Sequence, residues 1–503
     1  MFPWGTLLVG VAGAGALATL GARLSRAAKG VPAPAAPRPR LGSRDVALVL
    51  ALLGVALLLR LWHLESRVLD NDEPASLGLF DLDSWARDDD ARLHPPLAGL
   101  LLSAAFAARA LIGDARGVST LAGVLTVAWV YLALFPRGRI RALAGGALCA
   151  IAPAMLHASQ LARGYALAAA CLLAAHLALS RALRLGTTRS WLLYLVAGIG
   201  CLFTEYVTLG PLCAEALMAF ADRRTTRAER IRITTTVGGV LAVGALFVPF
   251  AWSTTLRGVG GPPRSPEGFL PSLMEGLDLV GAGFGVGAGA LILIYVAVIT
   301  LRGSTPPAQR RAGAAVLAAL LLLGVGGLIT AMRPRYLLPA FPLLIVATLG
   351  ATARRDLTAG IAAALVVAQG LLLPCYLSQG CAASELSRGR VLAATLEAAR
   401  SHSRLPLVVV PSWAIAEPSY RLLHAFPGPD SRRDCPARLC VSGRTFDGKP
   451  RELYGLNEDE LATRLGPLRA SGKLLLLHRG NERRVVGCAP IAEDPDAALL
   501  LCD

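Results

Sequence analysis

The sequence predicts an all-α polytopic membrane bundle followed by a small C-terminal α/β domain, and three observations support this. The chain has 503 residues, of which 54% are hydrophobic and only 17% are charged. Its mean hydropathy of +0.55 lies outside the range of soluble globular proteins and within that of multi-pass membrane proteins. Long apolar segments recur up to residue 376, whereas shorter apolar runs alternate with polar residues beyond residue 384.

The formal net charge of +16 is explained by basic residues at the membrane surface. Basic residues gather in short loops between apolar segments, for example at residues 137–141, 223–232 and 302–311. Such clusters mark cytoplasmic loops, so the positive charge requires no nucleic-acid partner.

The first 44 residues are predicted to hold an additional span and a linker. Residues 1–30 form an N-terminal transmembrane segment, because their basic residues follow the apolar stretch, whereas a secretory signal carries them before it. Residues 31–44 are a basic linker rich in Pro and Ala.

Residues 45–376 are predicted to form the main transmembrane domain, with a first exoplasmic loop at 63–116. The apolar run at 95–112 is expected to be a juxtamembrane helix, because counting it as a span would invert every later basic loop. Span boundaries within 190–221 stay open, since the runs there are shorter than the roughly 20 residues that a span needs. The eleven expected spans are 45–62, 117–135, 142–159, 164–183, 190–203, 206–221, 231–252, 278–301, 312–331, 336–352 and 357–376.

Residues 384–503 are predicted to form an exoplasmic α/β domain of an ordinary domain size. Apolar runs at 405–410, 473–478 and 484–487 indicate strands, and the pattern at 458–469 indicates a helix. The cysteines of this tail could form disulfides outside the cytoplasm, but their spacing does not reveal the pairing.

An acidic stretch at residues 69–97 holds the candidate catalytic residues. A carboxylate at a bilayer surface can take a proton from an incoming hydroxyl, and the adjacent pair Asp72 and Glu73 fits this task best. Asp70 is a nearby competitor. The alternative interpretation is a solvated acidic loop without chemistry.

Other polar residues are predicted to lie at the same exoplasmic face. His94 precedes two prolines, which fix an extended entry to the following segment. Arginines and tyrosines at span ends could simply reach the interface, but as a set they could clamp a phosphate. These residues are Arg163, Tyr165, Arg333, Arg335 and Tyr336. Glu205 either meets an arginine or faces a polar cavity.

These motifs resemble the GT-C glycosyltransferases of the protein O-mannosyltransferase and aminoarabinose-transferase type, also called glycosyltransferase family 39. The resemblance covers about residues 45 to 350. It rests on Asp72 with Glu73, HisProProLeu at 94–97, the stretch around Arg116, ArgGlyTyrAlaLeu at 163–167, and ArgTyrLeuLeuPro at 335–339. Two departures concern the donor and acceptor: Arg163 stands where aminoarabinose transferases carry an aspartate, and ThrGluTyr at 204–206 replaces ThrHisTyr or ThrLysTyr.

The resemblance implies an inverting transfer of a sugar from a polyprenyl-phosphate donor to an acceptor hydroxyl on a protein, lipid or glycan. Asp72 would be the base, and Arg116 and Tyr206 would join the substrate-binding residues. The expected location is the bacterial inner membrane, with the site and tail on the periplasmic side. No cofactor or divalent metal is expected, because arginines can neutralise one lipid phosphate and the acidic loop lacks a coordination spacing.

Two other function classes remain open. A flippase or transporter of polyprenyl-linked sugars would place its polar residues near mid-span and would show corresponding halves, whereas here they lie at one face and no repeat is evident. A non-catalytic membrane protein that binds envelope glycans would account for the departures from the family motifs.

Overall fold

The computed structural model describes two compact units, one helical and one built on a β-sheet. The described residues are 42–62, 64, 97, 101, 116–245, 273–274, 277, 286–329, 334–351, 367, 369–371, 373–374, 393–402, 404–410, 440–444, 450–456, 458–470, 472–479, 485–494 and 497–503. The predicted segment 1–30, most of the linker 31–44 and most of the last span fall outside them. The juxtamembrane helix predicted at 95–112 also does, apart from Leu97 and Leu101.

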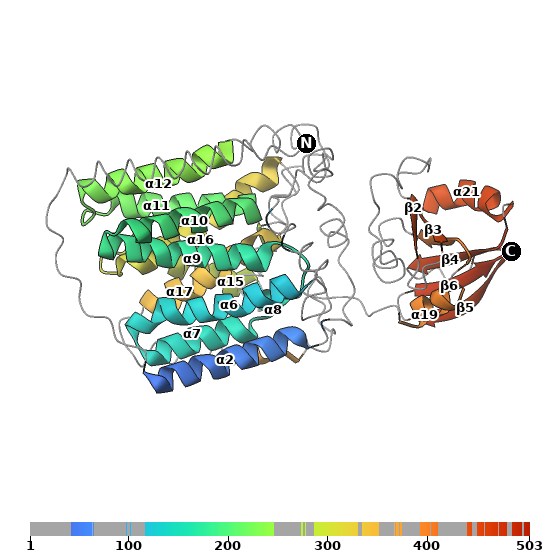
Figure 1. Ribbon diagram of the computed structural model, residues 1–503, viewed down its shortest axis with the longest axis horizontal. Coiled ribbons are helices and arrows are strands. Elements are labelled where there is room, and N and C mark those ends of the chain that lie inside the picture. Colours follow the sequence, from blue (N-terminus) through green and yellow to red (C-terminus); the bar gives the residue numbers. More distant parts are fainter. Residues whose placement is uncertain are drawn as a thin grey trace. The chain divides into compact units, whose positions relative to one another are not determined.

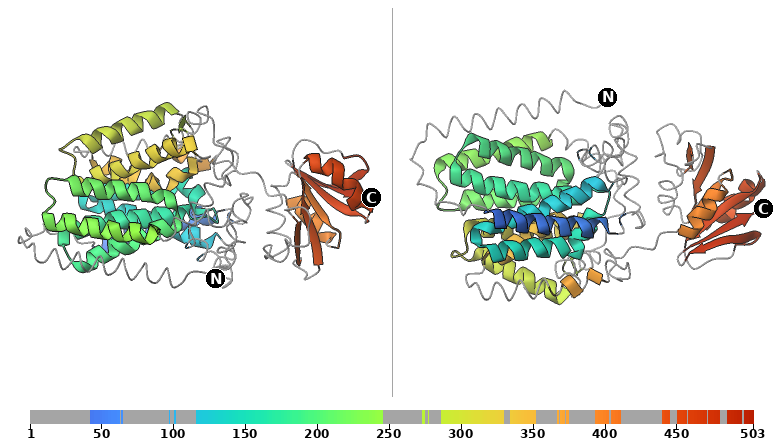
Figure 2. Two further views of the ribbon diagram at one scale, coloured as in Figure 1. Left: turned by 90° about the horizontal axis from the view of Figure 1, so that it is seen from above. Right: turned by 60° about the horizontal axis from the view of Figure 1, so that its bottom comes forward.

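The helical unit is a bundle of helices that run side by side (Figures 1 and 2). Its helices are α2 (Ser43–Leu61), α6 (Gly117–Leu134), α7 (Arg139–Ile151), α8 (Pro153–Ser159), α9 (Tyr165–Leu185), α10 (Thr188–Thr204), α11 (Leu209–Ala221), α12 (Arg227–Ala245), α15 (Val286–Leu301), α16 (Pro307–Ile329) and α17 (Phe341–Ala351). Short 3₁₀ turns are η2 (Phe135–Arg137), η3 (Tyr206–Thr208) and η4 (Pro334–Ala340). Where they are described, the predicted spans up to residue 352 fall on these helices and turns, and the predicted fold class is confirmed.

Membrane-spanning length varies among these helices. Within the described residues, Gly117–Arg137 and Tyr165–Leu185 are each long and apolar enough to cross a membrane. The bent pair α7 and α8 adds a third if it counts as one span, and four further apolar helices are shorter.

The predicted span 142–159 is not one straight helix, because α7 and α8 meet at 60°. Pro153 has no N–H to donate to the carbonyl of Cys149, so the helical ladder breaks there. The buried guanidinium of Arg60 in α2 donates to the carbonyl oxygens of Cys149 and Ala150, both at 3.3 Å, and to Ser159 Oγ at 3.1 Å. Arg60 thus satisfies carbonyls that the bend releases.

A second buried polar group lies along the bundle. His176 Nδ1 in α9 is 2.7 Å from Glu215 Oε1 in α11, and both side chains are almost fully buried. Tyr194 of α10 and Arg311 of α16 interact electrostatically with Glu215. Arg311 Nη2 also donates to Ser180 Oγ at 2.8 Å. The pair therefore joins four helices inside the bundle.

The C-terminal unit is a six-stranded mixed sheet with the order β2-β3-β1-β4-β6-β5. Its elements are α19 (Ala393–Ser401), β1 (Leu407–Val410), β2 (Cys440–Arg444), β3 (Pro450–Gly455), α21 (Glu458–Ala470), β4 (Leu474–Arg479), β5 (Cys488–Asp494) and β6 (Ala497–Cys502). Strands β3, β1 and β4 are parallel, and the outer strands pair antiparallel.

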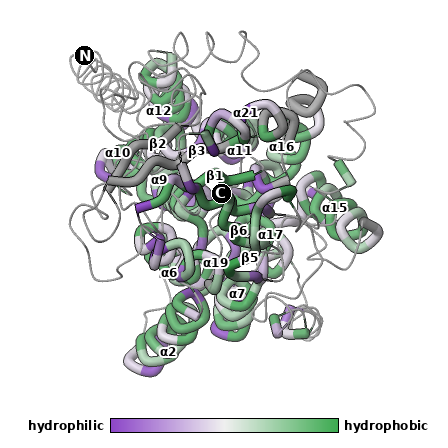
Figure 3. Tube along the Cα trace, turned by 90° about the vertical axis from the view of Figure 1, so that its right-hand side faces the viewer, coloured by the Kyte–Doolittle hydropathy of each residue, from purple (hydrophilic) through white to green (hydrophobic). Residues whose placement is uncertain are grey.

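The sheet is covered on both faces. Alternate residues of β1, such as Leu407 and Val409, pack with α19, whereas Val408 and Val410 pack with α21. Strands that are buried on both faces have continuous apolar sequences, and β1 and β6 are accordingly hydrophobic along their length (Figure 3). The predicted strands at β1 and β4 and the predicted helix at α21 are confirmed. Of the strand predicted at 484–487, the described residues 485–487 instead lead into β5 through a turn, in which Gly487 has φ +74°.

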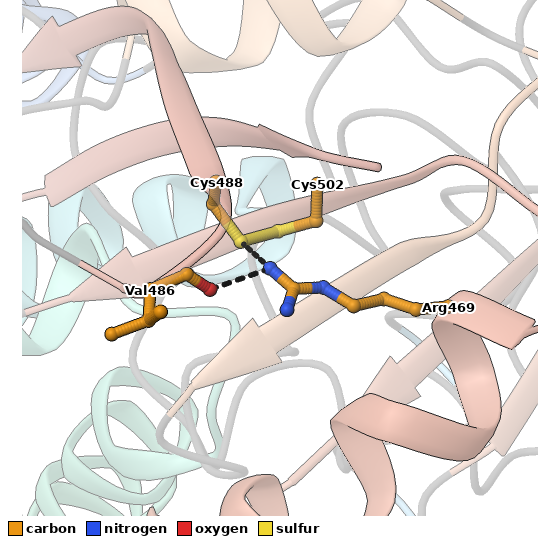
Figure 4. Close-up of a disulfide and its surroundings, with 4 residues drawn as sticks. All are labelled: Arg469, Val486, Cys488 and Cys502. Atoms are coloured by element: carbon orange, nitrogen blue, oxygen red, sulfur yellow. Dashed lines mark hydrogen bonds between the residues drawn. A yellow bond between two sulfur atoms is a disulfide. The ribbon is translucent and has the colours of Figure 1, made fainter.

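A disulfide joins Cys488 to Cys502, the residues that pair across β5 and β6 (Figure 4). Their Cα atoms are 4.1 Å apart, a short cross-strand separation that a disulfide can bridge. Arg469 Nη2 donates to the carbonyl of Val486 at 2.7 Å and to Cys488 Sγ at 2.9 Å. Of the pairings that spacing left open, the described residues establish this one, which joins neighbouring strands.

Candidate functional site

One end of the helical unit gathers one short connection, one helix start and two 3₁₀ turns. The α8–α9 connection, the start of α6, η3 and η4 meet there, and η4 packs against α8, α9 and η3. Connections can present polar groups because their backbones are not committed to a helical ladder, so this end can carry a site.

The connection that carries Arg163 is tied to α6. Ser119 Oγ donates to the carbonyl of Arg163 at 3.0 Å, and Thr120 Oγ1 donates to the carbonyl of Ser159 at 3.2 Å. The Arg163 side chain is 4% exposed, and its guanidinium carbon lies 5.7 Å from the ring centroid of Tyr165. This is within the range of a cation–π contact, which orients the guanidinium.

Aromatic contact joins α9 to η4. The buried ring of Tyr165 meets the ring of Tyr336 edge to face, with centroids 6.1 Å apart. Arg335 precedes Tyr336 and acts electrostatically on Tyr165, as Arg163 does. The two arginines therefore approach the same ring from different segments.

Glu205 provides the negative charge of this group. It is the C-cap of α10 and is 6% exposed. Burial raises the pKa of the Glu205 carboxyl to about 7, although the guanidiniums of Arg163 and Arg335 oppose that rise. Near neutral pH the carboxylate is thus only partly ionised while both arginines act on it, and guanidinium groups so placed suit a phosphate.

We call Arg163, Tyr165, Glu205, Arg335 and Tyr336 the outer cluster. These five residues were predicted from the sequence, and the structure brings them together. Tyr206, also predicted, follows Glu205 in the chain, lies in η3 and interacts electrostatically with Glu205.

The remaining predicted residues are placed differently. Arg116 is fully buried at the N-cap of α6, three residues before Ser119. Asp72, Glu73, His94 and Arg333 lie outside the described residues. Among the residues that are described, no group of three His, Cys, Asp or Glu could hold a metal ion. The acidic stretch is not part of that set, so the expectation of no metal stays a prediction.

Sequence reasoning missed Gln160 and Arg60, which connect the outer cluster to the start of the acidic loop. Gln160 Nε2 donates to the carbonyls of Arg60 at 2.9 Å and Trp62 at 3.1 Å. It thereby caps the C-terminal end of α2, from which the loop 63–116 departs. The signals were a lone arginine in an apolar span and a glutamine three residues before Arg163.

Comparison with solved structures shows the fold. ArnT from Cupriavidus metallidurans in the apo state is similar with a TM-score of 0.54 and 14% identity, covering 91% of this chain and 98% of that one. ArnT of the same organism bound to undecaprenyl phosphate gives a TM-score of 0.53 and 13% identity, over 92% and 98% of the chains. The Archaeoglobus fulgidus oligosaccharyltransferase gives a TM-score of 0.44 and 13% identity, over 86% and 68% of the chains.

No family model matches the chain, and no curated protein matches it. The structural similarity to ArnT extends over nearly the whole of both chains. The protein therefore has the GT-C type of fold, in agreement with the resemblance seen in its motifs, and is a membrane protein.

Proposed function

We propose that this protein is an inverting glycosyltransferase, which moves a sugar from a polyprenyl-phosphate donor to an acceptor hydroxyl on the exoplasmic face of the bacterial plasma membrane. The observation that carries the proposal is the outer cluster, in which two buried or half-buried arginines share one carboxylate of raised pKa. ArnT, which shares the fold, has been solved with undecaprenyl phosphate bound, and this supports a polyprenyl-phosphate partner.

The arginines of the outer cluster would hold the leaving phosphate. The phosphate of a lipid-linked sugar gains negative charge as the bond to the sugar breaks, and fixed cations that face this charge stabilise the transition state. The backbone carbonyl of Arg163 accepts a hydrogen bond from Ser119 Oγ, and its guanidinium contacts the ring of Tyr165. Such a preorganised guanidinium loses little freedom when it meets the phosphate.

Asp72 would act as the base. The acceptor hydroxyl would approach the anomeric carbon opposite the phosphate, and Asp72 would take its proton while Glu73 positions the loop. His94, Arg116, Tyr206 and Arg333 would contribute to binding of the substrates.

Two features support the proposed location. Basic residues cluster in loops opposite to the outer cluster, as expected for cytoplasmic loops. The disulfide between Cys488 and Cys502 is of a kind that persists in oxidising compartments. The tail, proposed as residues 384–503, would thus be periplasmic. We expect no metal or other cofactor.

A flippase or transporter is the second candidate, because of the pair His176 and Glu215. Ionisable residues inside the membrane are a frequent mark of transport pathways. A non-catalytic protein that binds envelope glycans would also use a cluster of aromatic and charged residues.

Reconstitution separates these candidates. The purified protein in proteoliposomes would receive polyprenyl-phosphate sugars from a bacterial envelope extract, and release of polyprenyl phosphate would be measured with and without a chelator. We expect release that requires an acceptor and survives chelation. A flippase would move the lipid-linked sugar between leaflets without cleaving it, and a binding protein would do neither. Loss of release on chelation would contradict the metal-free mechanism.

A further inference from the structure

The surface of the helical unit contains a groove between α6, α9 and α10, with a cavity volume of about 730 Å³. Its lining includes Leu125 and Trp129 of α6, Ala174 of α9, and Val196 and Gly200 of α10. Arg181 is the one charged side chain in this lining. A cavity of this size is in the range of ligand-binding sites.

The groove arises from the sizes of the side chains. Small residues such as Ala174 and Gly200 form part of it, whereas Leu125 and Val196 are bulkier and remain 43% and 65% exposed. A Cβ on Gly200 would lie only 3.2 Å from Cys171 Sγ, so a larger residue would crowd α9 there. Exposed apolar side chains on a helix of membrane-spanning length face lipid chains, so the groove suits a hydrocarbon chain.

Positive charge gathers at one end of the groove. Arg181 and Arg184 lie three residues apart near the end of α9 and therefore on one face of that helix. Phe135 and Pro136, which immediately precede Arg137, line the same cavity. Among the described residues, no carboxylate forms an ion pair with Arg181 or Arg184. By contrast, Arg139 at the start of α7 is paired with Asp45.

The charged end of the groove lies far from the outer cluster. Tyr165 begins α9 beside Arg163, and Arg181 follows sixteen residues later on the same helix, about 24 Å away at the rise of an α-helix. This distance is close to the thickness of a bilayer hydrocarbon core, about 30 Å. The positive-inside rule places Arg181 in the cytoplasmic leaflet if the outer cluster is exoplasmic.

We propose that the groove binds an anionic glycerophospholipid of the cytoplasmic leaflet, with an acyl chain along the apolar lining and its phosphate at Arg181 and Arg184. Unpaired guanidiniums beside an apolar groove match the two parts of such a lipid, and basic pockets between helices are known to select anionic head groups. The site differs from the proposed donor site because its phosphate lies at the opposite end of α9.

Native mass spectrometry of the delipidated full chain tests the proposal by titration with phosphatidylglycerol and phosphatidylcholine. We expect phosphatidylglycerol to bind more tightly. The double variant Arg181→Gln with Arg184→Gln should weaken its binding roughly 30-fold, at about 1 kcal/mol for each arginine. Arg189→Gln is the matched control, because Arg189 is an exposed cation in the first turn of α10 and lies outside the groove lining.

A second pair of variants tests the acyl-chain path. Ala174→Phe should fill the groove and reduce binding of both lipids, whereas Leu192→Phe adds bulk to an exposed position outside the lining and should change neither. Equal binding of both lipids that the arginine variants leave unchanged would overturn the proposal. Displacement of phosphatidylglycerol by polyprenyl phosphate, together with loss of both in Arg163→Ala, would assign the groove to the donor and also overturn it.

Discussion

Two buried polar groups of the helical unit differ in how their charges are balanced. The outer cluster is carried by connections at helix ends, and two arginines, Arg163 and Arg335, act on one carboxylate, Glu205, whose pKa is about 7. The inner group lies on helices α9, α10, α11 and α16. There Glu215 meets His176 directly and Arg311 electrostatically.

The difference separates a binding site from a structural contact. In the inner group His176 and Arg311, which lie on neighbouring helices, are the partners of Glu215. In the outer cluster two arginines act on one carboxylate that burial leaves partly protonated near neutral pH, and guanidinium groups of this kind suit a phosphate. This leads us to expect that changes in the inner group alter stability and changes in the outer cluster alter binding.

The largest expected effect on stability is that of Glu215→Leu. Removing one partner of a buried pair typically costs about 3–5 kcal/mol, because the remaining polar groups stay buried. Denaturation of the detergent-solubilised protein should show this loss, while transfer per folded molecule stays near normal. A variant with unchanged stability and lost turnover would place Glu215 in the chemistry.

The double variant His176→Leu with Glu215→Leu should be less destabilised than the sum of the two single variants. Replacing both partners by apolar residues leaves fewer unpaired groups than replacing one. A double-mutant cycle of unfolding free energies measures the coupling. Strict additivity would show that the two side chains do not support each other.

Arg335→Ala should weaken donor binding with little effect on stability. A hydrogen bond to a charged group contributes about 1.5–3 kcal/mol, which corresponds to a loss of roughly 10- to 150-fold in affinity. Titration of a short-chain polyprenyl-phosphate sugar measures it, and Arg310→Ala, near the start of α16, serves as the control. Equal losses in both variants would indicate a general effect of charge.

The smallest expected effect is the pH dependence of donor binding. Above about pH 7 the Glu205 carboxylate is ionised and competes with the donor for the two arginines, whereas below that pH it is protonated. The phosphodiester donor keeps one charge throughout, so its affinity should rise as pH falls from 8 to 6 (roughly one unit either side of the pKa). Glu205→Gln should abolish this dependence. A rise of affinity with pH would contradict the assignment.

Hydropathy and charge could predict the helices, because an apolar segment that crosses a membrane must satisfy its own backbone hydrogen bonds, and an α-helix does so. The bend at Pro153 could also have been predicted, since a proline inside a predicted span breaks the helical hydrogen-bond pattern. The pairing of His176 with Glu215 was not, because it depends on how two helices pack. The role of Arg60 likewise depends on carbonyls of another helix.

In the sheet and the site, too, local sequence patterns predicted some features, whereas others depend on how distant segments pack. The six-residue apolar run of β6 was overlooked, and the polar strands β2 and β3 have weak patterns because they lie toward one edge of the sheet. The residues of the outer cluster could be identified from motifs, but the shared use of Glu205 by two arginines required the arrangement of α9, η3 and η4.

The most direct test of the account compares turnover and donor binding in Asp72→Asn. Loss of a general base typically costs about 10² to 10⁴ in rate, whereas the arginines that bind phosphate would remain in place. We therefore predict that purified Asp72→Asn binds the polyprenyl-phosphate donor as tightly as the wild type and loses most of its transfer activity. Asp81→Asn, in the same acidic stretch, should retain activity. Near-normal turnover of Asp72→Asn would contradict the proposed division between a carboxylate that activates the acceptor and arginines that hold the phosphate.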